Sequence, residues 1–465
     1  MRHKRATHTE GTFEMHSTST VRVKVEPNGT GVVAHVGLHA LGRFADQIGL
    51  GAALSSAIIP RGERAPAHDR GKVLVHMALV LAGGGESCLD VEHLRAQPAL
   101  FGDVASDTTV FRALHELGPT QRAELAPALR AVRGKVWDRI DDGGRVILDV
   151  DATLVEVHTE SKQGAAPTYK GGFGFHPMAC FLDATGECLA ARLRPGNAGA
   201  NTVADHVGLL DEAIAQLPEH VAKGHRVGET GAGREVLIRA DAAGMTQGFV
   251  SACRDRDVRF MVTARSNSQI TAAIHDASVI EGLWRDAVTK DGELREGAAV
   301  TELTELVDLS SMPRGTRLIV RREPLHQGAQ RSLFPSLDFR YWGFLTDLDG
   351  DVRELDQLMR EHAHVEDSIA RLKDTGLARM PFTSFEANAA WLSVVCLAAD
   401  LVRWFQLLCL DGPWRSAKAK ALRWELFHAP GRLVRRARRM IVRILTGWPN
   451  AEVLLAAHRR IALLT

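Results

Sequence analysis

The chain has 465 residues, of which 45% are hydrophobic and 24% charged, with a formal net charge of +1. This composition is that of a globular protein with room for two or three domains, and it excludes a low-complexity chain. The near-neutral total hides a basic segment, because ten basic and two acidic residues fall between Asp411 and Leu445. A basic segment on a mildly acidic body indicates a polyanionic partner, with nucleic acid first, although a merely solvated arginine-rich helix is the alternative.

Cysteine usage and apolar runs indicate the compartment. The six cysteines form no Cys-x-x-Cys pair, which favours buried thiols in a reducing environment over disulfides or zinc. Residues 1–20 lack the apolar core of a signal peptide, and we expect them to form a disordered tail. The longest apolar run, 389–399, is too short to span a membrane. We therefore expect a soluble, cytoplasmic protein.

Residues 21–142 are predicted to form a mainly helical N-terminal module. After a short strand at 21–25, the periodicity predicts helices near 38–48, 72–82, 108–117 and 120–140. Ser106 is a good N-cap candidate for the third of these helices. DNA-end binding, dimerisation and simple packing all stay open as roles for this module.

Residues 143–264 change character and are predicted to form a mixed sheet with helices on its faces. The expected order is three strands (146–151, 176–183, 187–194), a helix (202–216), a strand (235–241), a helix (245–254) and a strand (258–264). An Ala-Thr-Gly turn joins the second and third strands as a tight hairpin. The order βββαβαβ predicts an α/β fold.

The rest of the chain divides into three predicted parts. Residues 265–350 read as a β-rich segment, 351–410 as core helices, and 411–465 as a basic helical C-terminal region. Within the last part, the apolar residues of 431–446 keep helical spacing and the arginines line the opposite side. This arrangement predicts an amphipathic, arginine-rich helix.

Carboxylates at strand ends are the strongest functional signal. Asp149 and Asp151 share one face of the strand 146–151, since alternate residues of a strand point the same way. Asp241 ends the strand 235–241 in a similar manner. Carboxylates at the ends of neighbouring strands can meet at one edge of a sheet, where they suit Mg²⁺ chemistry on phosphates. For each aspartate alone, a turn or N-cap role is the alternative.

A third carboxylate is predicted on the helix 354–373. Glu366 follows His362 by four residues and precedes Lys373 by seven, so that all three share one helical face. A carboxylate flanked by cationic groups suits a metal ligand beside a phosphate backbone. An exposed, ion-paired helix face is the alternative.

Together the segments LDVDAT, IRADAAG and HAHVEDSIARLKDTGL resemble a DDE transposase of a bacterial insertion sequence. The likeness is to the branch whose catalytic domain carries a β-rich insertion between the second Asp and the Glu. Glu366 and Lys373 keep the final spacing of that branch's helix signature, whereas Met359 and His362 stand where Tyr and Arg are expected. The resembling region is 145–445, most of the chain.

The resemblance implies a ribonuclease-H-like fold of the retroviral-integrase superfamily, interrupted by a β-rich insertion at 265–350. It also implies two divalent ions, Mg²⁺ with Mn²⁺ as a substitute, held by Asp151, Asp241 and Glu366, with Asp149 as a supporting carboxylate. The implied activity is cleavage of double-stranded DNA at the element's ends and transfer of the freed 3′-OH to target DNA. Implied partners are terminal inverted repeats, target DNA and a second copy of the chain, in a complex associated with the nucleoid.

Several further side chains are candidate DNA contacts. Besides His362 and Lys373 they are Lys170, Arg192, Arg194, Trp342, Arg435, Arg436 and Arg439. Each phosphate that such a cation neutralises makes DNA binding more sensitive to salt. Edge charges are the alternative for Arg192 and Arg194, and core packing is the alternative for Trp342.

Two other functions compete with the transposase. Asp-x-Asp-x-Thr after an apolar strand is also the first motif of haloacid-dehalogenase-like phosphatases, with Asp149 as the nucleophile. That function needs a later strand with paired acidic residues, whereas the comparable strand end carries only Asp241, and it leaves Glu366 unexplained. A catalytically inactive DNA-binding relative is the third possibility, and the complete Asp/Asp/Glu set argues against it.

Overall fold

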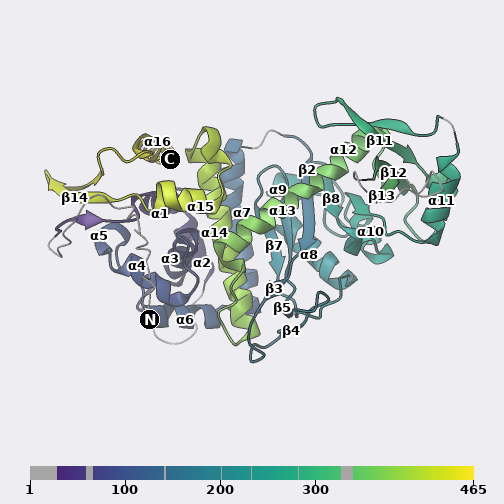
Figure 1. Cartoon of the computed structure of the whole chain (residues 1–465). Coiled ribbons are helices and arrows are strands. Elements are labelled where there is room, and N and C mark those ends of the chain that lie inside the picture. The colour runs from purple at the N-terminus through teal and green to yellow at the C-terminus, as the bar shows by residue number, and fades with distance from the viewer. Residues whose placement is uncertain are drawn as a thin grey trace, which may run out of the picture.

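The computed structural model describes residues 29–58, 66–140, 143–200, 202–231, 233–280, 282–325 and 339–464. In these residues the chain forms a helical lobe and a sheet lobe, and the long helix α14 (Phe385–Cys409) lies between them (Figure 1). The tail expected at 1–20 and the strand expected at 21–25 lie outside the described residues.

The sheet lobe is built on a mixed sheet of nine strands, counted over the described residues. Its order is β10-β11-β12-β13-β9-β8-β2-β6-β7. The strands are β2 (Val146–Ala152), β6 (Met178–Leu182), β7 (Cys188–Arg192), β8 (Val236–Ala240), β9 (Val258–Thr263), β10 (Arg285–Val288), β11 (Leu294–Glu302), β12 (Arg317–Pro324) and β13 (Phe339–Thr346).

The first five strands of this sheet along the chain have ribonuclease-H topology. β2 pairs antiparallel with β6 and parallel with β8, β6 pairs antiparallel with β7, and β8 pairs parallel with β9. Parallel neighbours need a crossover, and α8 and α10 lie along the connections to β8 and β9. The α/β fold predicted from the strand order is confirmed.

The predicted β-rich insertion is also present, and it continues the same sheet. β13 pairs antiparallel with β9, with Phe344 opposite Thr263, and β12, β11 and β10 follow as antiparallel neighbours. Figure 1 shows these strands at the end of the molecule that lies opposite the helical lobe. Core and insertion therefore share one hydrogen-bonded framework.

Helices cover both faces of the sheet. They are α8 (Val203–Gln216), α9 (Glu219–Ala222), α10 (Gln247–Arg254), α11 (Ser268–Ser278), α12 (Val352–Arg360) and α13 (His364–Leu372). β2 shows why two faces are needed, since Leu148 and Val150 belong to the apolar cluster under α8 and α10, whereas Ile147 packs against the cluster under α12. Asp149 and Asp151 point to the α12 and α13 side, which decides what surrounds them.

The segment predicted as a single helix at 354–373 is two helices, α12 and α13. A 3₁₀ turn at Glu361–Ala363 separates them. A π-helical turn at Lys373–Leu377 then ends α13, with Gly376 at a φ of 117°. The predicted Glu366 therefore lies in the first turn of α13, three residues after the break.

The helical lobe joins both ends of the described chain. It contains α1 (Val36–Gln47), α2 (Leu50–Ala57), α3 (Arg70–Ala82), α4 (Glu92–Arg95), α5 (Pro98–Phe101), α6 (Asp107–Glu116), α7 (Pro119–Ile140), α15 (Ala419–Leu422) and α16 (Ala451–Ala462). The four helices predicted here are confirmed, and Ser106 caps α6 by accepting from the backbone N–H of Thr109. α2, α4 and α5 were not predicted, because each is too short to show helical periodicity.

α14 passes through this core as its central helix. By length and composition it could cross a membrane, but 67% of its most apolar window is buried inside the protein. Its contacts to α3, α7 and β7 explain that apolar character. α14 is therefore the core helix that the sequence predicts.

The predicted arginine-rich helix at 431–446 is wrong. The segment forms a hairpin of β14 (Gly431–Arg436) and β15 (Arg439–Ile444), and β1 (Val32–Val33) pairs with β14. Ala437 and Arg438 turn the chain with φ of 48° and 63°, the left-handed pair that a two-residue hairpin turn requires. Valine and isoleucine on both sides favour strands.

Candidate active site

Three carboxylates lie around one edge of the sheet. Asp151 is the penultimate residue of β2, and Asp241 follows β8 directly. Because β2 and β8 are parallel and Val150 pairs with Ala240, both aspartates come one residue after that pair, at the same edge. Glu366 lies in the first turn of α13 and is exposed.

Electrostatics links these three side chains. Burial raises the pKa of Asp151 to about 6, and the charges of Asp241 and Glu366 act in the same direction. His362 opposes them in part, as does the hydrogen bond that the backbone N–H of Ala152 donates to Asp151 at 2.6 Å. No ion pair joins any of the three carboxylates to a lysine or arginine among the described residues. Negative charge therefore gathers at this edge without a paired lysine or arginine among the described residues.

This donor set fits a divalent cation by its chemistry. Carboxylate oxygens are the ligands that Mg²⁺ and Mn²⁺ prefer, and a cation would relieve the repulsion that raises the pKa of Asp151. Within the described part of the chain, no three His, Cys, Asp or Glu side chains stand close enough together to hold a metal ion as they are. The three carboxylates thus surround a common region without converging on one point.

Asp149 differs from Asp151 in its partners, although both lie on one face of β2. Asp149 is 1% exposed, and its two oxygens accept hydrogen bonds from Arg239 at 2.7 Å each. One of them also lies 2.7 Å from Nδ1 of His362. Although burial acts against it, hydrogen bonds from His362 and Arg239 hold the pKa of Asp149 below its ordinary value. The charge of Asp149 is therefore balanced inside the protein.

Arg239 is the site residue that the sequence reasoning missed. It is fully buried in the middle of β8, directly opposite Asp149 in the sheet register. Its guanidinium also pairs with Asp183 at 2.9 Å and donates to the carbonyl of Leu358 on α12 at 2.7 Å. An arginine inside the apolar run VLIRA was the available signal, because a buried arginine needs a buried carboxylate partner.

The two cationic neighbours of Glu366 lie in different surroundings. His362 is turned inward onto Asp149, with its side chain 13% exposed. Lys373 begins the π-helical turn, half-buried, and its side chain makes no hydrogen bond or ion pair with the described residues. Lys373 is thus the freer cation, while His362 ties the start of α13 to β2.

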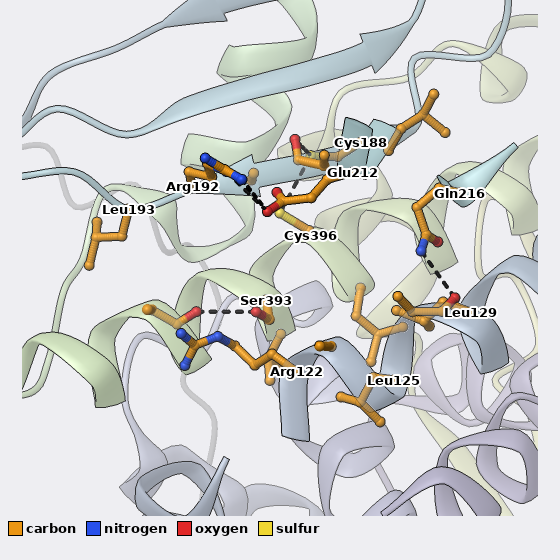
Figure 2. Close-up of a pocket in the computed structure, with 18 of the residues that line it drawn as sticks. Arg122, Leu125, Leu129, Cys188, Arg192, Leu193, Glu212, Gln216, Ser393 and Cys396 are labelled. Carbon is orange, nitrogen blue, oxygen red and sulfur yellow. Dashed lines mark hydrogen bonds and ion pairs between the residues drawn. The ribbon is translucent and has the colours of Figure 1, made fainter. Parts of the chain in front are cut away.

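Two of the predicted DNA contacts are used inside the fold. Arg192 pairs with Glu212 of α8 at 2.7 Å, as Figure 2 shows. Arg194 is 3% exposed, donates to the carbonyl of His176, and pairs with Asp205 at 3.2 Å. The guanidinium of Arg194 is therefore enclosed by the fold, whereas the side chain of Arg192 stays 32% exposed beside its partner.

The other predicted DNA contacts are accessible to different degrees. Lys170 is exposed in the loop between the short strands β4 (Ala166–Pro167) and β5 (Phe173–Phe175), where its ammonium lies 5.7 Å from the ring of Tyr169. Trp342 is half-buried, with the guanidinium of Arg321 4.8 Å from its ring centre. One face of Trp342 is therefore already covered by a cation.

A cavity of 590 Å³ lies apart from the carboxylate edge. It is lined by α7, β7, α8 and α14, and Figure 2 shows Cys188 and Cys396 in its wall. Their sulfur atoms are 3.5 Å apart, and all six cysteines are free thiols. None of the three clustered carboxylates lines this cavity.

The surroundings of Asp149 argue against the phosphatase alternative. A nucleophilic carboxylate must reach its substrate, whereas Asp149 is buried with both oxygens engaged. The fold also provides no second acidic residue directly after Asp241, where Ala242 and Ala243 begin a 3₁₀ turn. The accessible carboxylate chemistry lies at Asp151, Asp241 and Glu366.

Comparison with known proteins gives a family. Residues 15–465 match the family described as Transposase DDE domain group 1. A solved structure, described as a piggyBac transposase synaptic complex with hairpin DNA, shares 11% identity and a TM-score of 0.40, covering 84% of this chain and 80% of that chain. That likeness is too weak to carry an argument. No curated protein sequence matches the chain.

Proposed function

The chain belongs to the DDE transposase family, whose members cut and join DNA, and we propose that Asp151, Asp241 and Glu366 form its catalytic site. The observation that carries this assignment is the gathering of three carboxylates at one sheet edge without a paired lysine or arginine among the described residues. Two residues away, Asp149 has an arginine and a histidine as partners. The proposed reaction is cleavage at the ends of an insertion sequence, followed by joining of the 3′-OH to target DNA.

We further propose that the site works with two divalent ions, Mg²⁺ or Mn²⁺. Asp151, Asp241 and Glu366 would hold them, and Asp149 would support the site through Arg239 and His362. Bound there, such ions lower the pKa of an attacking water or 3′-OH and stabilise charge on the leaving oxygen.

The residues around the triad set its geometry. The pair of Asp149 and Arg239 links β2 to β8, the two strands that carry Asp151 and Asp241. His362 contacts Asp149 from the helical side and precedes Glu366 by one helical turn. These links would hold the catalytic carboxylates in register before DNA and metal arrive.

The proposed DNA-contacting residues are graded by their exposure. Lys170 is exposed and Lys373 is half-buried, and neither has a carboxylate partner among the described residues. Trp342 is half-buried and already contacts Arg321. The hairpin arginines are all exposed; Arg436 and Arg439 share one face of the hairpin and are the better supported contacts, whereas Arg435 lies on the opposite face. His362, Arg192 and Arg194 have partners within the fold, which gives them less support as direct DNA contacts.

The remaining parts of the proposal concern the biological setting. We propose that the protein is bacterial, acts in the cytoplasm on nucleoid DNA, and binds the terminal inverted repeats of its own element. A homodimer would pair two DNA ends in one complex. The helical N-terminal module would supply DNA-end binding or dimer contacts.

A strand-transfer assay on the element's own ends tests the catalytic assignment. We expect wild-type protein to join ends in Mg²⁺ or Mn²⁺ and to be inactive after chelation. Asp151→Asn, Asp241→Asn and Glu366→Gln should each abolish joining while DNA-end binding persists. Retained joining in any one variant removes that residue from the triad, and wild-type protein that binds ends without cutting them would identify an inactive relative.

A further inference from the structure

The hairpin of β14 and β15 projects from the helical lobe. Figure 1 shows it at the end of the molecule opposite the β-rich insertion. It carries six of the chain's arginines, all exposed: Arg432, Arg435, Arg436, Arg438, Arg439 and Arg443. None of them makes an ion pair with a described residue. This concentration of unpaired cations is separate from the catalytic carboxylates.

The strand register sorts these arginines by face. Residues directly opposite each other in an antiparallel pair share a face, and so do alternate residues along a strand. The pairs on one face are Arg432 with Arg443, Val434 with Ile441, and Arg436 with Arg439. We call this the arginine face. Arg435, in contrast, pairs with Met440 on the other face.

The other face holds the hairpin to the protein. Leu433, Val442 and Ile444 lie on that face and pack against the apolar core of the helical lobe. The arginine face is thereby directed away from the protein body. Its central apolar pair is also accessible, with Ile441 38% exposed.

The arginine face is unfavourable as an element of the isolated protein. Like charges directly opposite each other destabilise an antiparallel pair, and this face contains two such pairs. The turn adds strain, because Ala437 and Arg438 adopt left-handed backbone angles that favour glycine or asparagine. An arrangement with these costs is explained if an anionic partner binds the face.

We propose that the arginine face binds the phosphate backbone of duplex DNA, as a two-stranded ribbon laid across a groove. The two arginine pairs lie four residues apart along each strand, which corresponds to about 13 Å. The major groove of B-DNA is about 12 Å wide, so each pair can reach one of the two phosphate strands that border it. Val434 and Ile441 then face the groove between them.

The proposed contact rests on the proposed function, because it requires DNA to be the substrate. It adds a DNA-binding surface that is remote from the cleavage site. It also divides the hairpin arginines that the sequence grouped together. Arg436 and Arg439 belong to the binding face, whereas Arg435 does not.

Two matched double variants of the full-length chain test the assignment. Arg436→Gln with Arg439→Gln removes two charges from the arginine face, and Arg435→Gln with Arg438→Gln removes two charges from the opposite face and the turn. Binding to a labelled duplex carrying the element's end is measured as a function of salt. The first variant should lower the slope of log K against log salt by about 2, because each phosphate contact contributes about 0.9. The second should leave the slope near the wild-type value.

A second double variant tests the end of the arginine face that lies away from the turn, so that a change in turn structure cannot explain the result. Arg432→Gln with Arg443→Gln should lower the slope by about the same amount. Both face variants should melt at or above the wild-type temperature, since they remove like-charge pairs, so a loss of binding cannot be ascribed to unfolding. An equal decrease of the salt slope in the face variant and in the matched control would overturn the assignment, because any positive charge on the hairpin would then act alike. An unchanged slope in both variants would also overturn it, because the hairpin would then not contact phosphate.

Failure of this inference is distinguishable from failure of the catalytic assignment. Asp151→Asn should keep the wild-type salt slope and lose joining. The arginine-face variants should instead need a higher DNA concentration for half-maximal joining, whereas no DNA concentration should restore joining in Asp151→Asn. Cleavage by Asp151→Asn would remove the catalytic proposal and leave the binding comparison intact.

Discussion

Two groups of carboxylates lie beside the same sheet of this transposase, and they differ in whether the protein supplies an arginine partner. Behind β7, Glu187 is fully buried and accepts hydrogen bonds from Arg133 at 3.0 Å, Trp137 at 3.0 Å and Trp404 at 2.6 Å. Asp400 of α14 pairs with the same arginine at 2.7 Å. This buried group joins the helical lobe to the sheet lobe.

Asp151, Asp241 and Glu366, at the carboxylate edge, have no arginine partner in the part of the chain that the structure describes. Burial raises the pKa of Asp400 to about 7 and that of Asp151 to about 6, but Asp400 contacts Arg133 whereas Asp151 lies beside Asp241 and Glu366. The protein thus supplies arginines where charge serves the fold. No arginine among the described residues pairs with Asp151, Asp241 or Glu366, where a metal ion and a phosphate are expected to bind. This lack of a partner distinguishes the proposed catalytic site from the buried group.

The largest effect is expected from a substitution among Asp151, Asp241 and Glu366 at the carboxylate edge. Asp151→Asn should lower the rate of strand transfer by about 10³-fold or more, because the proposed metal site would lose one of its ligands. The same variant should not lower the melting temperature, since it relieves repulsion among carboxylates. Single-turnover joining and thermal unfolding measure the two quantities. A variant that is both inactive and unstable would contradict the contrast between the groups.

Removing the arginine from the buried group of Glu187 and Asp400 should instead lower the stability of the fold. Arg133→Met leaves Glu187 and Asp400 without their cation, and we expect a loss of about 3 to 5 kcal/mol in the free energy of unfolding. Arg130→Met on the same helix is the matched control, because its partner Glu219 is exposed and such a pair contributes at most about 1 kcal/mol. Urea unfolding of both variants is the measurement, and equal losses would refute the special role of the buried group.

Asp149 combines features of both groups. It lies near the carboxylate edge, but like Glu187 and Asp400 it has a buried arginine as its partner. Asp149→Asn should reduce joining by about 10- to 100-fold, as a loosened support for the catalytic geometry does, and it should leave affinity for DNA ends unchanged. Kinetics at saturating DNA, alongside Asp151→Asn, provide the test. Complete inactivity of the Asp149 variant together with an active Asp151 variant would reverse their assigned roles.

The smallest expected effect concerns His35, a half-buried base with no acidic partner among the described residues. Burial, with the nearby His428 and His93, lowers the pKa of His35 to about 4. The unfolded chain therefore binds the proton first, and the stability that neutral His35 contributes is present above pH 6.5 and is lost as the pH falls toward 4. His35 begins α1 with left-handed angles, which asparagine tolerates well.

His35→Asn should therefore flatten the pH dependence of unfolding between pH 6.5 and 4 by about 1 to 2 kcal/mol, a value reduced from the full shift because solvent screens this half-exposed group. Urea unfolding at several pH values measures this change. A parallel pH dependence in the wild type and the variant would show that His35 does not carry the effect.

The sequence was sufficient for the sheet, the insertion and the position of the three carboxylates. Strand ends are visible as apolar runs that stop at Asp151 and Asp241, and their meeting follows from parallel pairing. The difference between Asp149 and Asp151 was not visible, because both lie on one face of one strand. Their roles separate only through Arg239, which is 90 residues from Asp149 along the chain and reaches it through the sheet register.

The hairpin shows a different limit. Apolar residues at 433, 434, 437, 440, 441 and 444 fit a helix of 3.6 residues per turn and also fit two short alternating strands. The turn between the strands, Ala437 and Arg438, lacks the Asn-Gly or Asp-Gly sequence that usually reveals a hairpin. Contact with β1 and with the core of the helical lobe, which local spacing does not report, favours the strands.

The continuity of the β-rich insertion with the core sheet also affects how this fold can change. Without β13, the backbone groups along one side of β9 would be an open edge, which invites pairing between molecules and aggregation. The outermost strand is instead β10, a four-residue strand that begins with the exposed Arg285 and Asp286, as protected edges commonly do. The segment called an insertion thus closes the sheet, and a shortened enzyme that lacks it would need a substitute cover for β9 to stay soluble.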